Sequence, residues 1–348
     1  MMICPDIAVC IVTHNSARDL ASCLDALDAQ QEVSFEIIVV DCASRDDSVA
    51  IARSRQAPDP RLPDSRVTDS KLGNSKLTVV ALPDNLGFAG GMNEAIGRSE
   101  APLILSLNAD AWVEPGFLKA LLNRMEGHPE LQVGAVTGRL VRFQEEGKPT
   151  LLDACGMYWT RNWRHFDRGS GEEDRGQWPV AEKVFGGTGA ATLFRRSALE
   201  DVAFENEIFD LSFHSFREDA ELCFRLRERG WEVLYEPTAR AVHRRFNLPD
   251  RRSQMPARVN YHSLKNRYLL RFYHQTAGNF ASTLAPTLLR DTLALIYVAL
   301  RERTSFAAYG WLWQQRHEIR RKRRWIQRRR TVPPAEVNRW FRMDGEPL

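Results

Sequence analysis

Residues 103–110 read LILSLNAD, an apolar run of Leu and Ile that ends abruptly in small and polar residues. A short continuous run of this kind is typical of a buried strand. Three similar runs lie earlier in the chain, at 7–12, 36–40 and 77–82. Each run is followed by a segment in which apolar side chains recur at helical spacing. This repetition of strand and helix predicts an α/β fold with a mostly parallel central sheet.

The polar residues that end these strands are the first candidates for function. Asp41 follows the second run, and Asn108 and Asp110 follow the fourth. In an open α/β sheet, ligands bind where the carboxyl ends of the strands meet. We therefore expect Asp41 and Asp110 to lie in one crevice. A helix cap or a turn is the alternative for each acid taken alone.

Length and composition bound the architecture. The chain has 348 residues, of which 43% are hydrophobic and 27% charged, which argues against global disorder and against a fibrous repeat. Domains of about 150 residues would give two domains, or one large domain with an appendage. We expect a globular unit over residues 1–250 and a helical, basic region over 251–348.

The net charge of +3 conceals a strong asymmetry. Residues 301–330 contain eleven Lys or Arg against two Glu, with Trp311, Trp313 and Trp325 among them. A basic helix that carries tryptophans is typical of contact with an anionic membrane surface. A solvated helix face or a contact between subunits of a homo-oligomer is the alternative. Nucleic-acid binding is less favoured, because no aromatic-rich recognition module is visible.

Cysteine usage and hydropathy indicate a cytoplasmic protein. The six cysteines form no C-x-x-C motif, which favours reduced thiols. The N-terminal apolar run is too short for a signal peptide. Residues 292–300 form the longest later apolar run, far short of the roughly 20 residues that span a bilayer. No transmembrane segment is therefore predicted.

Three further segments carry side chains suited to chemistry. Residues 85–93 read NLGFAGGMN, a glycine-rich loop that leads into a helix and can present amides to an anion. The spacing G-x-x-G-G is not the dinucleotide fingerprint. Glu218 and Asp219 begin a predicted helix, where one acid could accept a proton, although the helix dipole also favours acids there. His243 ends a predicted strand, and its imidazole suits a metal such as Mn²⁺ or a structural role.

Two stretches interrupt the alternation of strand and helix. Residues 53–76 are polar with three prolines, and we interpret them as a surface insertion. Residues 142–183 are rich in Gly, Trp and charged residues, which predicts a mobile loop over the site.

The order of these motifs resembles that of the inverting glycosyltransferases of family 2, and is closest to their rhamnosyltransferase-like branch. The resemblance covers roughly residues 5–275, and its strongest pieces are 85–93 and 209–231 with His243. It implies a GT-A fold with a C-terminal helical extension, a catalytic domain over 1–250, a nucleotide-sugar donor and a divalent metal, Mg²⁺ or Mn²⁺.

The resemblance also implies roles for individual residues. Asp219 would be the catalytic base with Glu218 beside it, and Asp110 and His243 would hold the metal. Asp41 would contact the nucleotide base, and Asn108 the ribose or donor sugar. Trp231 would pack behind the catalytic base, Asp219. The remaining residues implied in substrate binding are Thr13, Asn15, Asn85, Gly87, Asn93, Gly186 and Gly187.

Three positions depart from the family pattern. His14 replaces the usual tyrosine of the first turn, Asn108 replaces the usual first acid of the metal motif, and Cys42 replaces the usual asparagine after Asp41. Asp110 is therefore the one carboxylate of that motif, and stacking on the base is in doubt at His14.

The resemblance implies transfer of a sugar, with rhamnose as first choice, from a dTDP- or UDP-sugar to a hydroxyl group of a glycan or lipid-linked acceptor. Such an enzyme would act in cell-surface polysaccharide synthesis, in the cytoplasm or on the inner face of the plasma membrane. The alternatives are a non-catalytic nucleotide-sugar-binding or nucleic-acid-binding protein, and a nucleotidyltransferase, which would release pyrophosphate.

Overall fold

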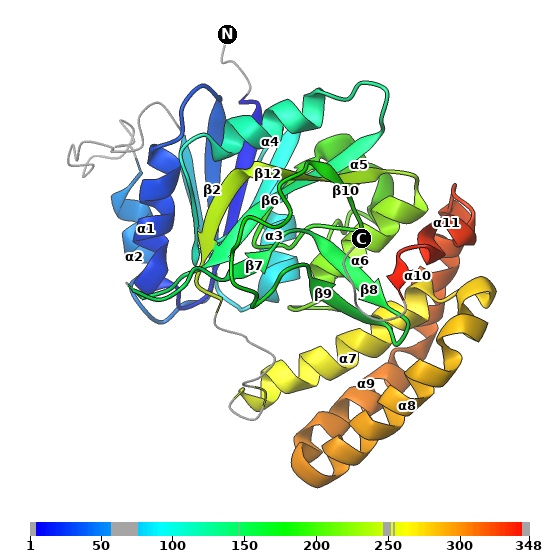
Figure 1. Cartoon of the computed structure of the whole chain (residues 1–348). Coiled ribbons are helices and arrows are strands. Elements are labelled where there is room, and N and C mark those ends of the chain that lie inside the picture. The colour runs from blue at the N-terminus through cyan, green and yellow to red at the C-terminus, as the bar shows by residue number, and fades with distance from the viewer. Residues whose placement is uncertain (1–4, 57–75, 146, 246–251, 253–254, 343–348) are drawn as a thin grey trace.

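The computed structural model describes residues 5–56, 76–145, 147–245, 252 and 255–342. Most of the predicted surface insertion, residues 57–75, lies outside this part of the chain. The described residues form a sheet-containing body flanked by a group of C-terminal helices (Figure 1).

A ten-stranded sheet forms the body within the described residues. Its main path runs in the order β10 (Glu182–Val184), β12 (Glu232–His243), β6 (Val133–Arg142), β11 (Ala191–Arg195), β4 (Leu103–Asn108), β1 (Ile7–Thr13), β2 (Phe35–Cys42) and β3 (Leu77–Leu82). The four strands predicted from the apolar runs are adjacent and parallel. Strand β11 runs antiparallel between β4 and β6. The predicted mostly parallel α/β sheet is therefore confirmed.

Helices cover both faces of the sheet, which explains why its central strands are buried along nearly their whole length and are mostly apolar. On one face, Ile7, Val9 and Ile11 pack in a core with α1 (Ala17–Asp28) and α4 (Phe117–Glu126). The alternate strand residues pack against three helices on the other face: α3 (Gly87–Ile96), α5 (Arg196–Val202) and α6 (Glu218–Glu228). The short helix α2 (Ser48–Ser54) connects β2 to β3. The five described cysteines are buried free thiols, as predicted.

A third, aromatic core attaches the C-terminal helices to the body. Trp159, Trp163 and Phe224 are buried in it, and Trp159 lies 4.7 Å from Phe224 between ring centroids. The helices that surround this core are α7 (Ala257–His274), α8 (Ala277–Arg301), the 3₁₀ helix η2 (Arg303–Phe306), α9 (Ala307–Gln314), α10 (Arg316–Arg329) and α11 (Pro334–Asn338). The prediction of a helical C-terminal region is confirmed.

The prediction of a mobile loop over residues 142–183 is wrong. This stretch contains β7 (Leu152–Ala154), β8 (Met157–Thr160) and β9 (Arg164–Asp167), and it ends in β10. Strands β8 and β9 form a separate three-stranded sheet with β13 (Phe341–Arg342). The buried rings of Trp159 and Trp163 hold this hairpin in the aromatic core, which polar composition alone does not indicate.

The inner face of the basic helix α10 is used inside the molecule. Lys322 lies 2.6 Å from Asp210 and 3.1 Å from Glu207, and Arg330, just beyond the helix, pairs with Glu228. Ile319 and Ile326 are buried beside these pairs. The arginines and lysine at these positions neutralise acids of the body, so membrane contact through 301–330 stays a prediction for the cations that remain exposed.

Helix α8 is longer than the sequence indicates. It has 25 residues, and by length and composition alone it could cross a membrane, with 17% of its most apolar window buried. Arg290 and Asp291 interrupt the apolar run, which is why residues 292–300 by themselves look too short. One candidate by length and composition leaves the prediction of no transmembrane segment untested.

Candidate active site

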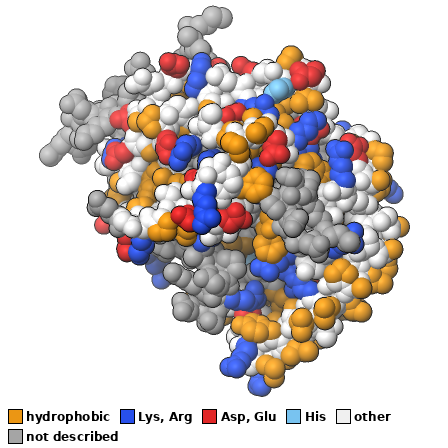
Figure 2. Space-filling model, in the orientation of Figure 1, with side chains coloured by type: hydrophobic (Ala, Val, Ile, Leu, Met, Phe, Trp, Pro, Cys, Tyr) orange, Lys and Arg blue, Asp and Glu red, His pale blue; other side chains and the backbone are white. Residues whose placement is uncertain are grey.

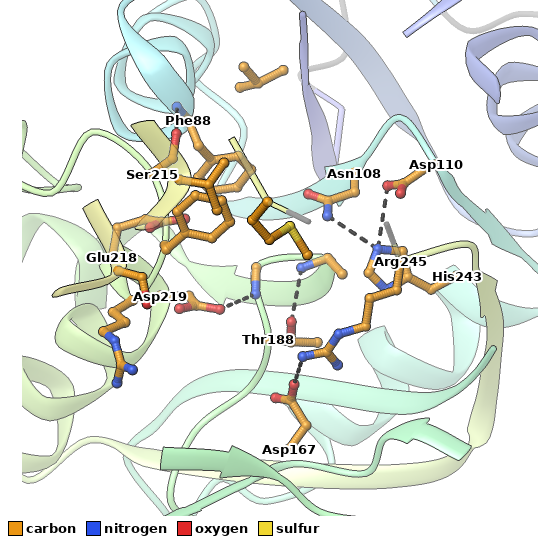
Figure 3. A pocket seen from close by; sticks show the side chains of 18 of the residues that line it. Phe88, Asn108, Asp110, Asp167, Thr188, Ser215, Glu218, Asp219, His243 and Arg245 are labelled. Atoms are coloured by element: carbon orange, nitrogen blue, oxygen red, sulfur yellow. Dashed lines mark hydrogen bonds and ion pairs between the residues drawn. The ribbon is translucent and has the colours of Figure 1, made fainter. Parts of the chain in front are cut away.

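A cavity of about 910 Å³ opens at the carboxyl edge of β1 and β4. Asp110, Asp219 and His243 all line it, although they come from three separate parts of the chain. In Figure 3, Glu218 and Asp219 lie on one side, across from Asn108, Asp110 and His243. Further lining residues are Phe88, Thr188, Ser215 and Arg245. The expected convergence of the three side chains is therefore observed, while their chemical roles stay predictions.

Strand pairing explains how Asp110 meets His243. Asp110 directly precedes β5 (Ala111–Val113), which pairs with the end of β12 so that Ala111 lies opposite His243. The pairing leaves Nε2 of His243 3.4 Å from Oδ1 of Asp110. The amide nitrogen of Asn108 lies at the same distance from that ring nitrogen.

The other ring nitrogen of His243 is held from behind by a buried carboxylate. Nδ1 lies 2.7 Å from Oδ2 of Asp153, which also accepts a hydrogen bond from Arg245. Burial alone would raise the pKa of Asp153, but the hydrogen bond with His243 and the charge of Arg245 lower it to about 2. Burial likewise opposes charge on His243, yet its bonds to Asp110 and Asp153 raise its pKa to about 9.

These residues fit a divalent cation. A carboxylate that orients the far nitrogen of an imidazole is the usual support of a histidine metal ligand. Among the described residues no group of three or more His, Cys, Asp or Glu gathers as a complete metal site. Asp110 and His243 would therefore supply two ligands, and phosphate oxygens and water the others, as Mg²⁺ and Mn²⁺ allow.

Asp219 is positioned by the backbone on the opposite wall. It lies in the first turn of α6, where Oδ2 accepts a hydrogen bond from the amide of Gly189 at 2.9 Å and Oδ1 one from Ala220 at 2.7 Å. Burial raises its pKa, the bond from Gly189 opposes this, and the charge of Asp167 adds to it, so that the pKa is raised overall. A carboxylate with a raised pKa at a cavity wall suits a general base.

Glu218 differs from its neighbour in its contacts. Its side chain is buried, and Oε2 has no hydrogen-bond partner within the described part of the chain. Burial first and the charge of Asp219 second raise the pKa of Glu218 well above its usual range. Burial raises the pKa of both adjacent acids, and that of Glu218 lies well above its usual range, which favours the neutral form of Glu218.

The predicted base-contacting residues are turned inward. The hydroxyl of Thr13 donates to Oδ2 of Asp41 at 2.8 Å, and the amide of Ser44 donates to Oδ1 at 2.9 Å. Neither Thr13 nor Asp41 is among the cavity-lining residues, whereas Asn15 and its neighbours His14 and Ser16 are. Asp41 therefore holds the turn after β2, and contact with a nucleotide base stays a prediction that would use its remaining lone pairs.

The glycine-rich loop acts mainly through its shape. Oδ1 of Asn85 accepts a hydrogen bond from the amide of Gly87, whose φ of +70° and contact with the backbone of His214 leave no room for a side chain. Asn93 clamps the backbone of Phe209 with two hydrogen bonds of 2.7 and 2.8 Å. These three predicted binding residues lie outside the cavity wall, and Phe88 faces the cavity instead.

Three further predicted contacts are displaced from the cavity. A Cβ on Gly186 would lie 2.7 Å from Sγ of Cys223, and one on Gly187 would lie 2.7 Å from Cβ of Thr137, so both glycines serve close packing. Their neighbours Thr188 and Gly189 line the cavity. Trp231 follows the far end of α6, where its indole donates to Asp201 at 2.9 Å. Asp219, the predicted catalytic base, lies in the first turn of the same helix, so the expectation that Trp231 packs behind it is wrong.

Several lining residues escape sequence reasoning. Arg164 and Asp167 come from β9, Arg217 precedes α6, and Arg290 lies on α8. No spacing links them to the motifs, because a hairpin and a distant helix carry them to the cavity. Arg245 was within reach, since it lies two residues after His243 at the end of the same strand.

Residues 8–203 match the family model of glycosyl transferase family 2, which is more than half of the chain. The chain belongs to glycosyltransferase family 2. The matched residues include β2, β3, β4 and Asp110, whereas Asp219 and His243 lie beyond them. The family expectation from the motifs is confirmed, while the rhamnosyltransferase-like branch is supported only at low identity.

Curated relatives carry names from bacterial polysaccharide synthesis. The succinoglycan biosynthesis protein ExoU of Rhizobium meliloti is 31% identical over 44% of this chain and 42% of its own length. An N-acetylglucosaminyltransferase of the same organism is 25% identical over 68% of this chain and 50% of its own. An N-acetylglucosaminyl-diphospho-decaprenol L-rhamnosyltransferase of Mycobacterium tuberculosis is 25% identical over 70% and 77%. The chain spans about half the length, or less, of the first two.

Solved structures support the GT-A type of fold. Staphylococcus aureus TarS has a TM-score of 0.51 at 16% identity, over 86% of this chain and 44% of that one. GalNAc-T7 with UDP, GalNAc and Mn²⁺ has a TM-score of 0.51 at 12% identity, over 78% of this chain and 48% of that one. At these identities the likeness extends to the fold alone, and with it the predicted GT-A architecture is confirmed.

Proposed function

We propose that this chain is an inverting glycosyltransferase that moves a sugar from a nucleoside-diphosphate sugar to a hydroxyl group of a glycan or lipid-linked acceptor. One observation carries the proposal: a single cavity holds the backbone-positioned carboxyl group of Asp219 across from the paired Asp110 and His243. This arrangement supports a proton acceptor at Asp219 and phosphate binding near Asp110 and His243, on opposite sides of the space where a donor sugar would lie.

Asp219 accepts the proton of the acceptor hydroxyl as its oxygen attacks the anomeric carbon. The bond from that carbon to the diphosphate breaks as the new bond forms on the opposite face, which inverts the configuration. The amides of Gly189 and Ala220 keep the carboxylate oriented. No covalent intermediate arises, so the mechanism requires no nucleophilic Ser or Cys.

Asp110 and His243 are the residues that would hold Mg²⁺ or Mn²⁺. When bound, the cation would neutralise charge on the leaving diphosphate. Asp153 fixes the orientation of His243, and Asn108 stands beside both ligands toward the donor.

The donor and acceptor are proposed from resemblance. A dTDP- or UDP-sugar is the expected donor, with rhamnose as first choice, and the mycobacterial relative named as an L-rhamnosyltransferase supports that choice. The same name and the succinoglycan proteins support an acceptor on the way to a cell-surface polysaccharide.

A panel of dTDP-, UDP- and GDP-sugars tests the proposed function. We expect one donor to raise the melting temperature in the presence of Mn²⁺ or Mg²⁺, and to release nucleoside diphosphate when acceptor is added. EDTA should remove that release. Release of pyrophosphate instead would assign the protein to the nucleotidyltransferases, and absence of any nucleotide-sugar binding would contradict the proposal.

The raised pKa of Asp219 predicts a shifted acid limb in the pH profile of kcat. A base works only when ionised, so activity should fall as the pH drops through a value above the usual aspartate range. Asp167→Asn removes a charge that raises this pKa and should move the limb to lower pH. Glu173→Gln, at an exposed pair, serves as control and should leave the limb in place. An unchanged or upward-shifted limb in Asp167→Asn would contradict this electrostatic coupling.

A further inference from the structure

One wall of the cavity is formed by arginines that the proposed chemistry does not use. Arg164 of β9, Arg217 before α6 and Arg290 of α8 all line the cavity, and we call them the arginine wall. They share the cavity with Asp219, yet they come from elements on the side of the C-terminal helices, away from β4 and β5, which carry Asn108 and Asp110.

The arginines of the wall are not ion-paired within the described residues, although Asp219 lines the same cavity and its charge opposes the lowering of the pKa of Arg217. Arg217 lies 3.0 Å from Nδ1 of His165, Arg290 donates to the carbonyl of Asn162 at 3.0 Å, and Arg164 lies over the ring of Phe166. In the part of the chain that the structure describes, none of these three guanidinium groups forms an ion pair with a carboxylate.

Arginines close to the wall form ion pairs with carboxylates, in contrast to the three arginines of the wall. Arg245 binds Asp153 and Asp167, Arg252 binds Glu302, and Arg271 binds Asp291. These arginines around the wall thus form ion pairs with acids, whereas the three arginines of the wall do not.

Electrostatic strain in the wall points the same way. Burial first, and then the charges of Arg267 and Arg164, lower the pKa of Arg217 to about 9. Burial, Arg267 and Arg217 lower the pKa of Arg290 to about 8. Cations gathered in a partly desolvated cavity are stabilised by a multivalent anion that neutralises them together.

Helix α8 connects this wall to the outside of the molecule in an unusual way. Two of its threonines face inward: Thr283 accepts a hydrogen bond from the indole of Trp163 at 3.4 Å, and Thr287 donates to the carbonyl of Arg161 at 3.3 Å. Arg290 lies on the same inner side. A surface helix of a soluble protein usually turns its apolar face to the core, whereas α8 turns these polar residues toward the protein.

The outer face of α8 is apolar and uncovered. Leu288, Leu289 and Leu300 are 62%, 64% and 71% exposed, and Figure 2 shows hydrophobic side chains gathered along this edge of the molecule. The other exposed members of this face are Phe280, Leu284, Leu293, Leu295 and Ile296. A patch of this extent marks an interaction surface.

Exposed arginines at the end of α8 and an exposed tryptophan on α9 point to a lipid surface as the occupant. Arg301 and Arg303 are exposed where α8 ends, and Trp313 is 70% exposed with Arg316 stacked on its ring at 4.8 Å. Leucines flanked by arginine and tryptophan are the composition of a helix that lies in the interface of an anionic membrane. Spanning the bilayer would break the bonds of Thr283, Thr287 and Arg290 to the β8–β9 turn.

We propose that the arginine wall binds the diphosphate of a lipid-linked acceptor whose membrane lies against the outer face of α8. This rests on the proposed function, since it names the class of acceptor for the same cavity. Arg290 would then bind the diphosphate of the acceptor, and the leucines of the same helix would contact the bilayer that holds its lipid chain. The acceptor sugar would extend from the wall toward Asp219.

Binding to doped vesicles tests the proposal with the whole chain saturated with UDP or dTDP and Mn²⁺. Phosphatidylcholine vesicles that carry farnesyl diphosphate should sediment the protein, and vesicles that carry farnesol should do so far less. Arg290→Gln should weaken sedimentation by about tenfold or more, as expected for a lost charge-assisted contact. Arg290→Lys should recover part of it, which separates charge from folding, and Arg175→Gln at an exposed site should change nothing.

A titration with inorganic pyrophosphate separates the lipid from a free anion. It should bind to the nucleotide-saturated protein and weaken in Arg290→Gln. The double variant Leu289→Glu/Leu293→Glu should lose vesicle binding and keep pyrophosphate binding, with Val180→Glu as the matched exposed control.

Four results would overturn the proposal. Displacement of pyrophosphate by the nucleotide would assign the arginines to the donor diphosphate. Equal binding to farnesol and farnesyl diphosphate vesicles would exclude recognition of the lipid diphosphate. Unchanged binding in Arg290→Gln would exclude a role of the arginine wall in that recognition. A dimer that the leucine variant dissociates would assign the α8 face to a second copy. Failure of the wild-type protein to bind any nucleotide would instead contradict the proposed function. Nucleotide binding is measured before vesicles are added, so the two failures are distinguishable.

Discussion

Asp219→Asn should lower kcat by about 10²–10⁴-fold while the affinity for the donor nucleotide stays nearly unchanged. The amide has the shape of the carboxylate but cannot take the proton of the acceptor hydroxyl. It can keep the hydrogen bond from Gly189 or the one from Ala220 but not both, so a small loss of stability accompanies the loss of turnover. Turnover is measured as released nucleoside diphosphate, and donor affinity by titration calorimetry.

Glu218→Gln is the matched control for this experiment. Glu218 lies one position away and favours its neutral form, so its amide should preserve far more activity than Asp219→Asn. Full turnover by Asp219→Asn would refute its role as base. Equal loss in both variants would show that the pair works as a unit rather than through Asp219 alone.

Arg225→Met should destabilise the fold by about 3–5 kcal/mol, because it leaves a buried carboxylate without its partner. Arg225 and Glu221 are both buried in α6 and form hydrogen bonds of 2.8, 3.0 and 2.7 Å. Arg225 also donates to the carbonyl of Ile208 at 2.6 Å, which fixes the segment before the helix. Burial alone would raise the pKa of Glu221, but Arg225 and His274 lower it to about 2, a measure of how strongly the charge is held.

Urea denaturation of the two proteins measures this loss, and Arg98→Met gives the comparison. Arg98 pairs with Glu94 on an exposed helix face, where such pairs contribute at most about 1 kcal/mol. The double variant Arg225→Met/Glu221→Leu should recover much of the stability, since no charge is then buried alone. Equal effects of Arg225→Met and Arg98→Met would be incompatible with this account.

The framework of the molecule could be predicted because its signal is local. The runs at 7–12, 36–40, 77–82 and 103–107 are almost entirely apolar, with Glu36, Thr78 and Ser106 as the exceptions, as expected of strands covered on both faces, and each became a parallel neighbour in the sheet. Hairpin β8–β9 could not be found in this way. Its two strands have only four residues each, and the buried tryptophans that hold the hairpin contact α6 and β13.

The candidate site was predicted unevenly for a related reason. Asp110, Asp219 and His243 stand at the ends of strands or the start of a helix, where topology delivers them to one edge. Asn93 and Trp231 share those motifs, yet their side chains bind the backbone of Phe209 and the carboxylate of Asp201. A motif specifies a residue type and a place in the chain, but the direction of a side chain depends on its packing partners.

The sequence by itself determined the α/β sheet, the edge at which function gathers and the family, because periodicity and motif order are properties of neighbouring residues. Only the tertiary structure decided that Asp153 stands behind His243, that arginines from β9, α6 and α8 form one wall, and that α8 presents its leucines outward. These features join residues from distant parts of the chain, and no spacing along it encodes which of them will meet.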